Sequence, residues 1–246
     1  MKINKIMMGM PIIVEIVGND QKIASTIENV FEYFEYVDEK FSVYKPDSEI
    51  SKINRGEIMP DSFSSDMKEI FRLAQITKDE TYGYFDINRN GKIDPSGIVK
   101  GWAIHNAGKI IKKFGYTNFY INVGGDIEVS GLNEQNKKWK VGIVNPFDQK
   151  TSIKTLYLTD CGIATSGNYE RGNHIYNPLE QSQNEIVSFT IIGPNVFEAD
   201  RYATPAFAMG YRGIEFIERQ KDLFGYIIDN KGIATMTSGF EQYINE

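Results

Sequence analysis

The sequence has few of the residues that build internal redox and thiolate metal sites. Of its 246 residues one is cysteine, Cys161, and two are histidine. A lone cysteine forms no internal disulfide and offers no set of thiolates for zinc or an iron–sulfur cluster. Any redox chemistry therefore needs a borrowed cofactor.

Long apolar runs and excess positive charge are also missing. No window reaches the roughly 20 apolar residues that a membrane-spanning helix requires. Gly9 and Pro11 interrupt the apolar N-terminal stretch, so we expect no signal peptide there and, for the chain as given, a cytoplasmic location. With 27 basic and 33 acidic residues the formal net charge is -6, which disfavours nucleic acid as a partner.

The chain is long enough for one sizeable core or two interleaved lobes, and its 41% of hydrophobic residues suits a globular protein. It contains no internal repeat, no low-complexity run and no linker rich in proline, glycine and serine. We therefore expect one compact domain over residues 1–246.

The first half of the chain shows mainly helical periodicity. A strand is predicted at residues 11–17, and apolar residues then recur at three- and four-residue steps from Ile23 to Phe41, which predicts a helix. Residues 42–54 are predicted as a loop with a helical turn at 48–51. Further helices are expected at residues 65–81 and in a segment from Trp102 to Phe114, after a loop at 86–96.

From Phe119 the hydrophobic period changes to two. Strands are predicted at residues 119–123, 139–144, 153–159, 186–192 and 224–229, with a helix around 201–220. Helices that precede strands favour an α+β fold over a doubly wound sheet.

A carboxylate and a hydroxyl stand four residues apart at Asp200 and Thr204. If Asp200 lies at or near a helix start, Thr204 follows one turn later on the same face. This pair suits Mg²⁺, which keeps waters and substrate phosphates in its other positions. The alternative is that Asp200 only caps a helix and Thr204 fills space.

A glycine-containing turn at residues 93–98 opens a helix and presents Lys100 one turn inside it. Backbone N–H groups and the positive helix end favour a phosphate there. The glycine spacing fits neither a Walker loop nor a dinucleotide fingerprint. The alternative is a capped surface helix.

Two further segments carry polar groups. Residues 165–175, expected as a loop between strands, place hydroxyls beside His174, which could deprotonate an attacking hydroxyl near neutral pH. The alternative is an incidental loop histidine. Residues 118–127 form a strand that runs into Gly124-Gly125, where a ligand approaches closely or a hairpin simply turns.

Taken in order, these segments resemble the ApbE family of FAD:protein FMN transferases. The similarity runs from Met8 to about Gly239, and its blocks lie at residues 8–10, 41–54, 83–86, 97–101, 122–126, 139–143, 165–167, 174–175 and 199–204. The resemblance implies a T-fold-like α+β fold with antiparallel sheets packed against helices, and FAD in a cleft between two interleaved lobes. Family members are often exported lipoproteins.

The resemblance also implies site residues. It assigns FAD binding to Met8, Tyr44, Asn54, Tyr84, Phe85, Asp86, Asp94, Lys100, Ser166 and Ile175, and Mg²⁺ binding to Gly97 through its carbonyl oxygen, Asp200 and Thr204. Lys100 and His174 are the expected catalytic residues, His174 as the base that activates the acceptor hydroxyl. His105 stands where the family usually has aspartate, and Asn177 and Pro205 also depart from its pattern.

The implied activity is Mg²⁺-dependent cleavage of the FAD pyrophosphate, with FMN transferred to a threonine or serine hydroxyl of a partner protein and AMP released. One alternative is an FAD pyrophosphatase with water as the acceptor. Another is a non-catalytic protein that binds or stores FAD.

Overall fold

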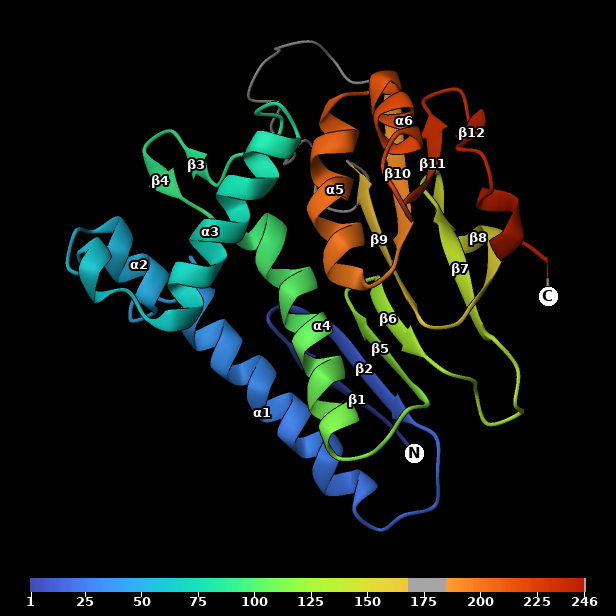
Figure 1. The fold of residues 1–246 in the computed structure, drawn as a ribbon, viewed down its shortest axis with the longest axis horizontal. Coiled ribbons are helices and arrows are strands. Elements are labelled where there is room, and N and C mark those ends of the chain that lie inside the picture. The colour runs from blue at the N-terminus through green and yellow to red at the C-terminus, as the bar shows by residue number, and fades with distance from the viewer. Residues whose placement is uncertain (168–184, 246) are drawn as a thin grey trace.

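The computed structural model describes residues 1–167 and 185–245 (Figure 1). Its largest element is an eight-stranded sheet in which all neighbouring strands are antiparallel, in the spatial order β1-β2-β5-β6-β9-β10-β11-β12. In chain order these strands are β1 (Lys2–Met7), β2 (Met10–Ile16), β5 (Phe119–Val123), β6 (Asp126–Ser130), β9 (Cys161–Gly167), β10 (Ile186–Gly193), β11 (Phe224–Asp229) and β12 (Ala234–Met236).

Two hairpins and six α-helices complete the described part. The hairpins pair β3 (Asn88–Arg89) with β4 (Lys92–Ile93), and β7 (Trp139–Asn145) with β8 (Asp148–Leu158). The helices are α1 (Ile23–Phe41), α2 (Glu49–Asn54), α3 (Ser65–Glu80), α4 (Ser96–Lys113), α5 (Val196–Ala208) and α6 (Tyr211–Glu218), with short 3₁₀ turns at Pro60–Ser62 and Phe240–Tyr243.

The two faces of the large sheet are covered by different elements, one by the β7–β8 hairpin and the other by helices. Side chains alternate between its faces, so Ile127 and Val129 of β6 pack with the β7–β8 hairpin, whereas Glu128 points to the helical side. Helices α1 and α4 bury their apolar stripes on β2 and β5, and α5 and α6 pack on β9 to β11 (Figure 1). The polar residues of β6 that face the helices are therefore buried between layers.

Most predicted elements are confirmed. The helix from Ile23 to Phe41 and the strands 119–123 and 224–229 have the predicted bounds. Four strands of the large sheet, β1, β6, β9 and β12, were not predicted. β1 pairs with β2 through a two-residue turn at Met8-Gly9, where both residues have positive φ (53° and 72°), as a tight hairpin requires.

Two predictions about helices differ from the structure. The helical turn predicted at 48–51 is confirmed as the start of α2, which Ser48 caps, but the helix continues to Asn54, where a loop was predicted. The helix expected around 201–220 is two helices, because Gly210, at φ 64°, ends the α5 segment and α6 begins at Tyr211.

Helix α5 also begins earlier than predicted. The Asn195 side chain caps it by accepting a hydrogen bond from the Glu198 N–H at 3.0 Å. Asp200 therefore lies in the second turn and not at the helix start. Pro205 lies inside the helix, which continues past it with Met209 N–H bonded to the Pro205 carbonyl at 3.0 Å.

Candidate active site

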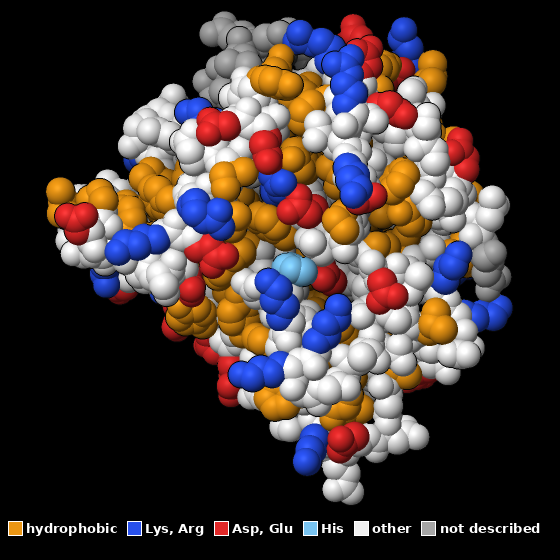
Figure 2. Space-filling model, in the orientation of Figure 1, with side chains coloured by type: hydrophobic (Ala, Val, Ile, Leu, Met, Phe, Trp, Pro, Cys, Tyr) orange, Lys and Arg blue, Asp and Glu red, His pale blue; other side chains and the backbone are white. Residues whose placement is uncertain are grey.

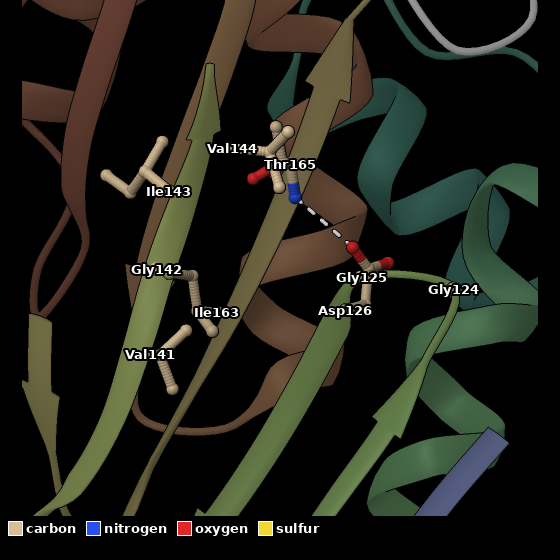
Figure 3. A pocket seen from close by; sticks show the side chains of 9 residues that line it. All are labelled: Gly124, Gly125, Asp126, Val141, Gly142, Ile143, Val144, Ile163 and Thr165. Atoms are coloured by element: carbon tan, nitrogen blue, oxygen red, sulfur yellow. Dashed lines mark hydrogen bonds between the residues drawn. The ribbon is translucent and has the colours of Figure 1, made fainter. Parts of the chain in front are cut away.

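A buried ion pair marks the site between α4 and β6. Lys100 Nζ lies 2.6 Å from Asp126 Oδ2, and the Asp126 side chain is only 2% exposed. The other carboxylate oxygen accepts a hydrogen bond from the Thr165 N–H at 3.2 Å, which Figure 3 shows at the end of the Gly124-Gly125 turn. Asp126 thereby joins α4, β6 and β9.

A second buried carboxylate lies beside this pair. Asp200 is 5% exposed, and its Oδ2 accepts a hydrogen bond of 2.7 Å from the Gly101 N–H. A Cβ added to Gly101 would lie 2.6 Å from the Asp200 Cβ, closer than real side chains approach. Glycine at position 101 therefore lets α5 bring its carboxylate against the α4 backbone.

The contacts show that α4 and α5 run antiparallel. The Gly101 N–H binds the Asp200 carboxylate directly. One turn later on α4, His105 contacts the Glu128 carboxylate. The same carboxylate binds the N–H of Val196, which lies one turn before Asp200 on α5. Gly97, one turn before Gly101, therefore faces the turn of α5 that carries Thr204. The helical repeat thus places the turns that carry the three predicted metal ligands along the α4–α5 contact.

Two hydroxyls complete this group. The Thr204 Oγ1 lies 3.3 Å from the Ser166 Oγ, within hydrogen-bond distance. Thr165 and Ser166 belong to strand β9, so the prediction that they lie in a loop is wrong. They are in the strand because the β9–β10 ladder continues to the Gly167–Ser188 pair.

Burial, and next the negative charge of Asp126, raise the pKa of the Asp200 carboxyl from 3.8 to about 7. The charge of Lys100 and the Gly101 N–H act in the opposite direction. Two carboxylates here share one lysine, so a cation beside Asp200 would offset the electrostatic cost of its ionised form.

The donor chemistry of this group fits Mg²⁺. It offers one carboxylate at Asp200, the Thr204 hydroxyl and a carbonyl from the first turn of α4, all of them oxygen donors. Residues 1–167 and 185–245 contain no cluster of three or more His, Cys, Asp or Glu side chains that could hold a metal. A cation at this place would therefore depend on the hydroxyl and carbonyl oxygens as well as on Asp200. A cation bound here would keep positions open for water and substrate phosphates, as Mg²⁺ commonly does.

The other predicted FAD residues lie around α2, α3 and the β3–β4 hairpin. The Asn54 amide donates to the Ile93 carbonyl and accepts from the Ile93 N–H, both at 2.8 Å. Asp86 pairs with Lys78 at 2.7 Å, and Asp94 accepts a 3.0 Å bond from the Ser96 N–H. These polar groups therefore already fix the chain that leads into α4.

The predicted aromatic residues differ in exposure. Phe85 is 4% exposed and its ring would contact a Cβ added to Gly97, so it supports the start of α4. Tyr44 is 93% exposed. The Tyr84 hydroxyl accepts a 2.9 Å bond from Arg212 of α6. Met8 lies in the β1–β2 turn, so the site prediction draws on widely separated segments.

His174 and Ile175 lie outside the described residues, as does Asn177. Asp126, by contrast, belongs to the same buried group and was not among the predicted site residues. Its signal was present in the Gly124-Gly125-Asp126 segment, which was weighed only as a hairpin or a close ligand approach. Lys100 and Asp126 are far apart in sequence, and only the packing of α4 on β6 pairs them.

A small pocket adjoins Asp126 between β7 and the Gly124-Gly125 turn (Figure 3). It encloses about 40 Å³, far less than the roughly 300 Å³ or more of typical small-molecule sites. This pocket alone therefore cannot hold FAD.

The surface carries charges of both signs. Figure 2 shows lysine and arginine interspersed with aspartate and glutamate, with hydrophobic side chains between them, over the face that it presents. No described helix combines the length and the apolar character that crossing a bilayer demands.

The chain belongs to the ApbE family, because the family's sequence model matches residues 8–91 and 88–227. An FAD:protein FMN transferase from Klebsiella pneumoniae (strain 342) is 26% identical over 151 residues, covering 57% of this chain and 43% of that protein. One from Haemophilus influenzae is 23% identical over 298 residues, covering 91% and 86%. The chain spans less than half the length of the first curated relatives that it matches, 43% to 47%.

Solved structures of the family share the fold. The ApbE protein of Thermotoga maritima superposes with a TM-score of 0.87 at 22% identity, covering 100% of this chain and 99% of that one. The flavin transferase ApbE from Vibrio cholerae gives 0.86 at 21% identity, covering 99% and 98%. The predicted α+β fold with an antiparallel sheet is thereby confirmed.

Proposed function

We propose that this chain is a Mg²⁺-dependent FAD:protein FMN transferase. In this reaction the FAD pyrophosphate is cleaved, FMN passes to a threonine or serine hydroxyl of a partner protein, and AMP leaves. Membership of the ApbE family and the names of the curated relatives support the proposal.

The observation that carries the proposal is the buried group around Asp200. A carboxylate whose pKa is raised to about 7 lies beside the Asp126–Lys100 ion pair and one helical turn from the Thr204 hydroxyl. A carboxylate that only capped a helix could do so at the solvent-exposed surface, without the cost of burial. Burying two carboxylates with a single lysine costs stability, which a functional cation site explains.

Gly97, Asp200 and Thr204 are the residues that would hold Mg²⁺. When bound, the cation supplies Lewis-acid polarisation of the pyrophosphate and charge neutralisation of the departing phosphate. Lys100, in the second turn of α4, contributes a positive charge near the helix start, where backbone N–H groups also favour phosphate. Asp126 holds that ammonium group in place.

The proposed reaction is a phosphoryl transfer and needs no oxidant or reductant. The acceptor oxygen attacks the phosphorus on the FMN side of the pyrophosphate, and the bond to the AMP oxygen breaks. His174 is the proposed base for the acceptor proton. Met8, Tyr44, Asn54, Tyr84, Phe85, Asp86, Asp94, Ser166 and Ile175 remain the proposed FAD contacts.

The function is tested by incubating the protein with FAD, Mg²⁺ and candidate acceptor proteins. We expect AMP release together with an acceptor whose mass has increased by FMN, and the loss of both in Asp200→Ala. Asp229→Asn, which changes a carboxylate near the β11 turn, is the matched control and should remain active. AMP without an adduct would replace the transferase by the pyrophosphatase, and intact bound FAD would indicate storage.

A further inference from the structure

A second buried carboxylate of β6, Glu128, also contacts α4. Glu128 lies two residues after Asp126 and therefore on the same face of the sheet. Its Oε1 lies 2.9 Å from the His105 Nδ1 on α4, and its Oε2 accepts a 2.7 Å bond from the Val196 N–H on α5. His105 is one turn from Gly101, and Val196 is one turn from Asp200.

Glu128 thus links β6 to α4 and α5, the two helices that carry the proposed ligands, one helical turn further along. It is 6% exposed, so its oxygens meet protein groups and little water. Val196 is the first residue of α5, where a negative charge also complements the helix dipole. A Cβ added to Gly162 of β9 would overlap the Val196 nitrogen, so the start of α5 is pressed against the sheet.

We propose that Glu128 is a positioning residue for the cation site. By holding the first N–H of α5 and the His105 ring of α4, it sets the spacing and register of the two helices. That register determines how far the Gly97 carbonyl lies from Asp200 and Thr204. The inference rests on the proposed function, because it takes these three residues as the Mg²⁺ ligands.

The chemistry of Mg²⁺ makes such positioning matter. The ion requires near-octahedral oxygen ligands at about 2.0–2.1 Å, so a small shift of one helix removes a ligand. Groups that hold ligands in place without touching the metal commonly change its affinity by about 10- to 100-fold. Asn195 already caps α5 through Glu198, so loss of Glu128 should displace the helix without unwinding it.

The test compares Glu128→Ala with Glu49→Ala. Glu49 is a matched control, because its carboxylate also secures a helix start, accepting bonds from Ser64 N–H at 2.8 Å and Ser64 Oγ at 2.7 Å before α3. Mn²⁺ affinity is measured by electron paramagnetic resonance in the presence of ADP, and stability by urea unfolding.

Glu128→Ala is expected to weaken Mn²⁺ binding about 10- to 100-fold while the protein stays folded. Glu49→Ala is expected to lower stability and leave Mn²⁺ affinity unchanged. Glu128→Gln, which keeps an acceptor for the Val196 N–H, should bind Mn²⁺ within a few-fold of wild type. Wild-type affinity in folded Glu128→Ala would overturn the inference, and so would Glu128→Gln as weak as Glu128→Ala.

Failure of the proposed function gives a different result. If Asp200→Asn binds Mn²⁺ as wild type does, Asp200 is not a ligand and the metal site itself is wrong. If Asp200→Asn loses Mn²⁺ binding and Glu128→Ala retains it, only the positioning role is overturned.

Discussion

Replacing Asp200 by asparagine should stabilise the metal-free protein near neutral pH. The native state raises the pKa of this carboxyl from 3.8 to about 7, so it binds a proton more tightly than the unfolded chain does. The contribution of this carboxyl to stability is then largest below about pH 4 and is lost as the pH rises through about 7. Asparagine carries no charge to bury, so it avoids this loss.

The size of the effect follows from proton linkage. The rise of the Asp200 pKa from 3.8 to about 7 corresponds to about 4 kcal/mol of unfolding free energy above pH 7. We expect Asp200→Asn to exceed wild type by about 2–4 kcal/mol at about pH 8, because the amide keeps only part of the Gly101 hydrogen bond. The difference should shrink towards zero near pH 4.

Urea unfolding in EDTA, followed by the fluorescence of Trp102 and Trp139, measures this difference. Asp229→Asn is a control of opposite sign: a hydrogen bond from the Tyr211 hydroxyl lowers the Asp229 pKa. That variant should therefore lose stability near neutral pH, and the loss should shrink as the pH falls. An Asp200→Asn variant less stable than wild type at about pH 8, or a gain independent of pH, would refute the reasoning.

Three further outcomes follow from the same contacts. Gly101→Ala should lower the unfolding free energy by about 1–3 kcal/mol, because the added Cβ would overlap Asp200. This loss outweighs the better helix propensity of alanine. Thermal melting measures it, with Gly108→Ala as the control, because a Cβ there would lie 3.3 Å from the nearest ring atom. Burial raises the pKa of the Cys161 thiol to about 12, so a thiol reagent at pH 8 should label it only after unfolding; rapid labelling of the native protein would contradict its burial. Lys100→Met should lower the rate of AMP release about 100-fold or more, since it removes the cation and leaves Asp126 unpaired; an unchanged rate would remove Lys100 from the mechanism.

Local sequence patterns predicted much of the fold. The stripe from Ile23 to Phe41 gave the correct helix bounds because one helical face packs on the sheet. Strand β6 was missed although its residues alternate between polar and apolar. All five are buried, because its acidic side chains pair with groups on the helices. The start of α5 was missed because Asn195, an ordinary capping residue, was not weighed against Asp200.

The site could be predicted only in part. Family blocks assigned Gly97, Asp200 and Thr204, and the antiparallel register of α4 and α5 brings their turns together. Asp126 and Glu128 depend on contacts between distant segments, which no local pattern encodes. Their proposed roles rest on the packing of α4 and α5 against β6.

The central claim is that one divalent cation binds between α4 and α5. The most direct measurement is an anomalous difference map from crystals grown with Mn²⁺ and ADP. We predict a single strong peak within coordination distance of the Asp200 carboxylate, the Thr204 hydroxyl and the Gly97 carbonyl. A peak elsewhere, with these three groups unoccupied at saturating Mn²⁺, would contradict the account.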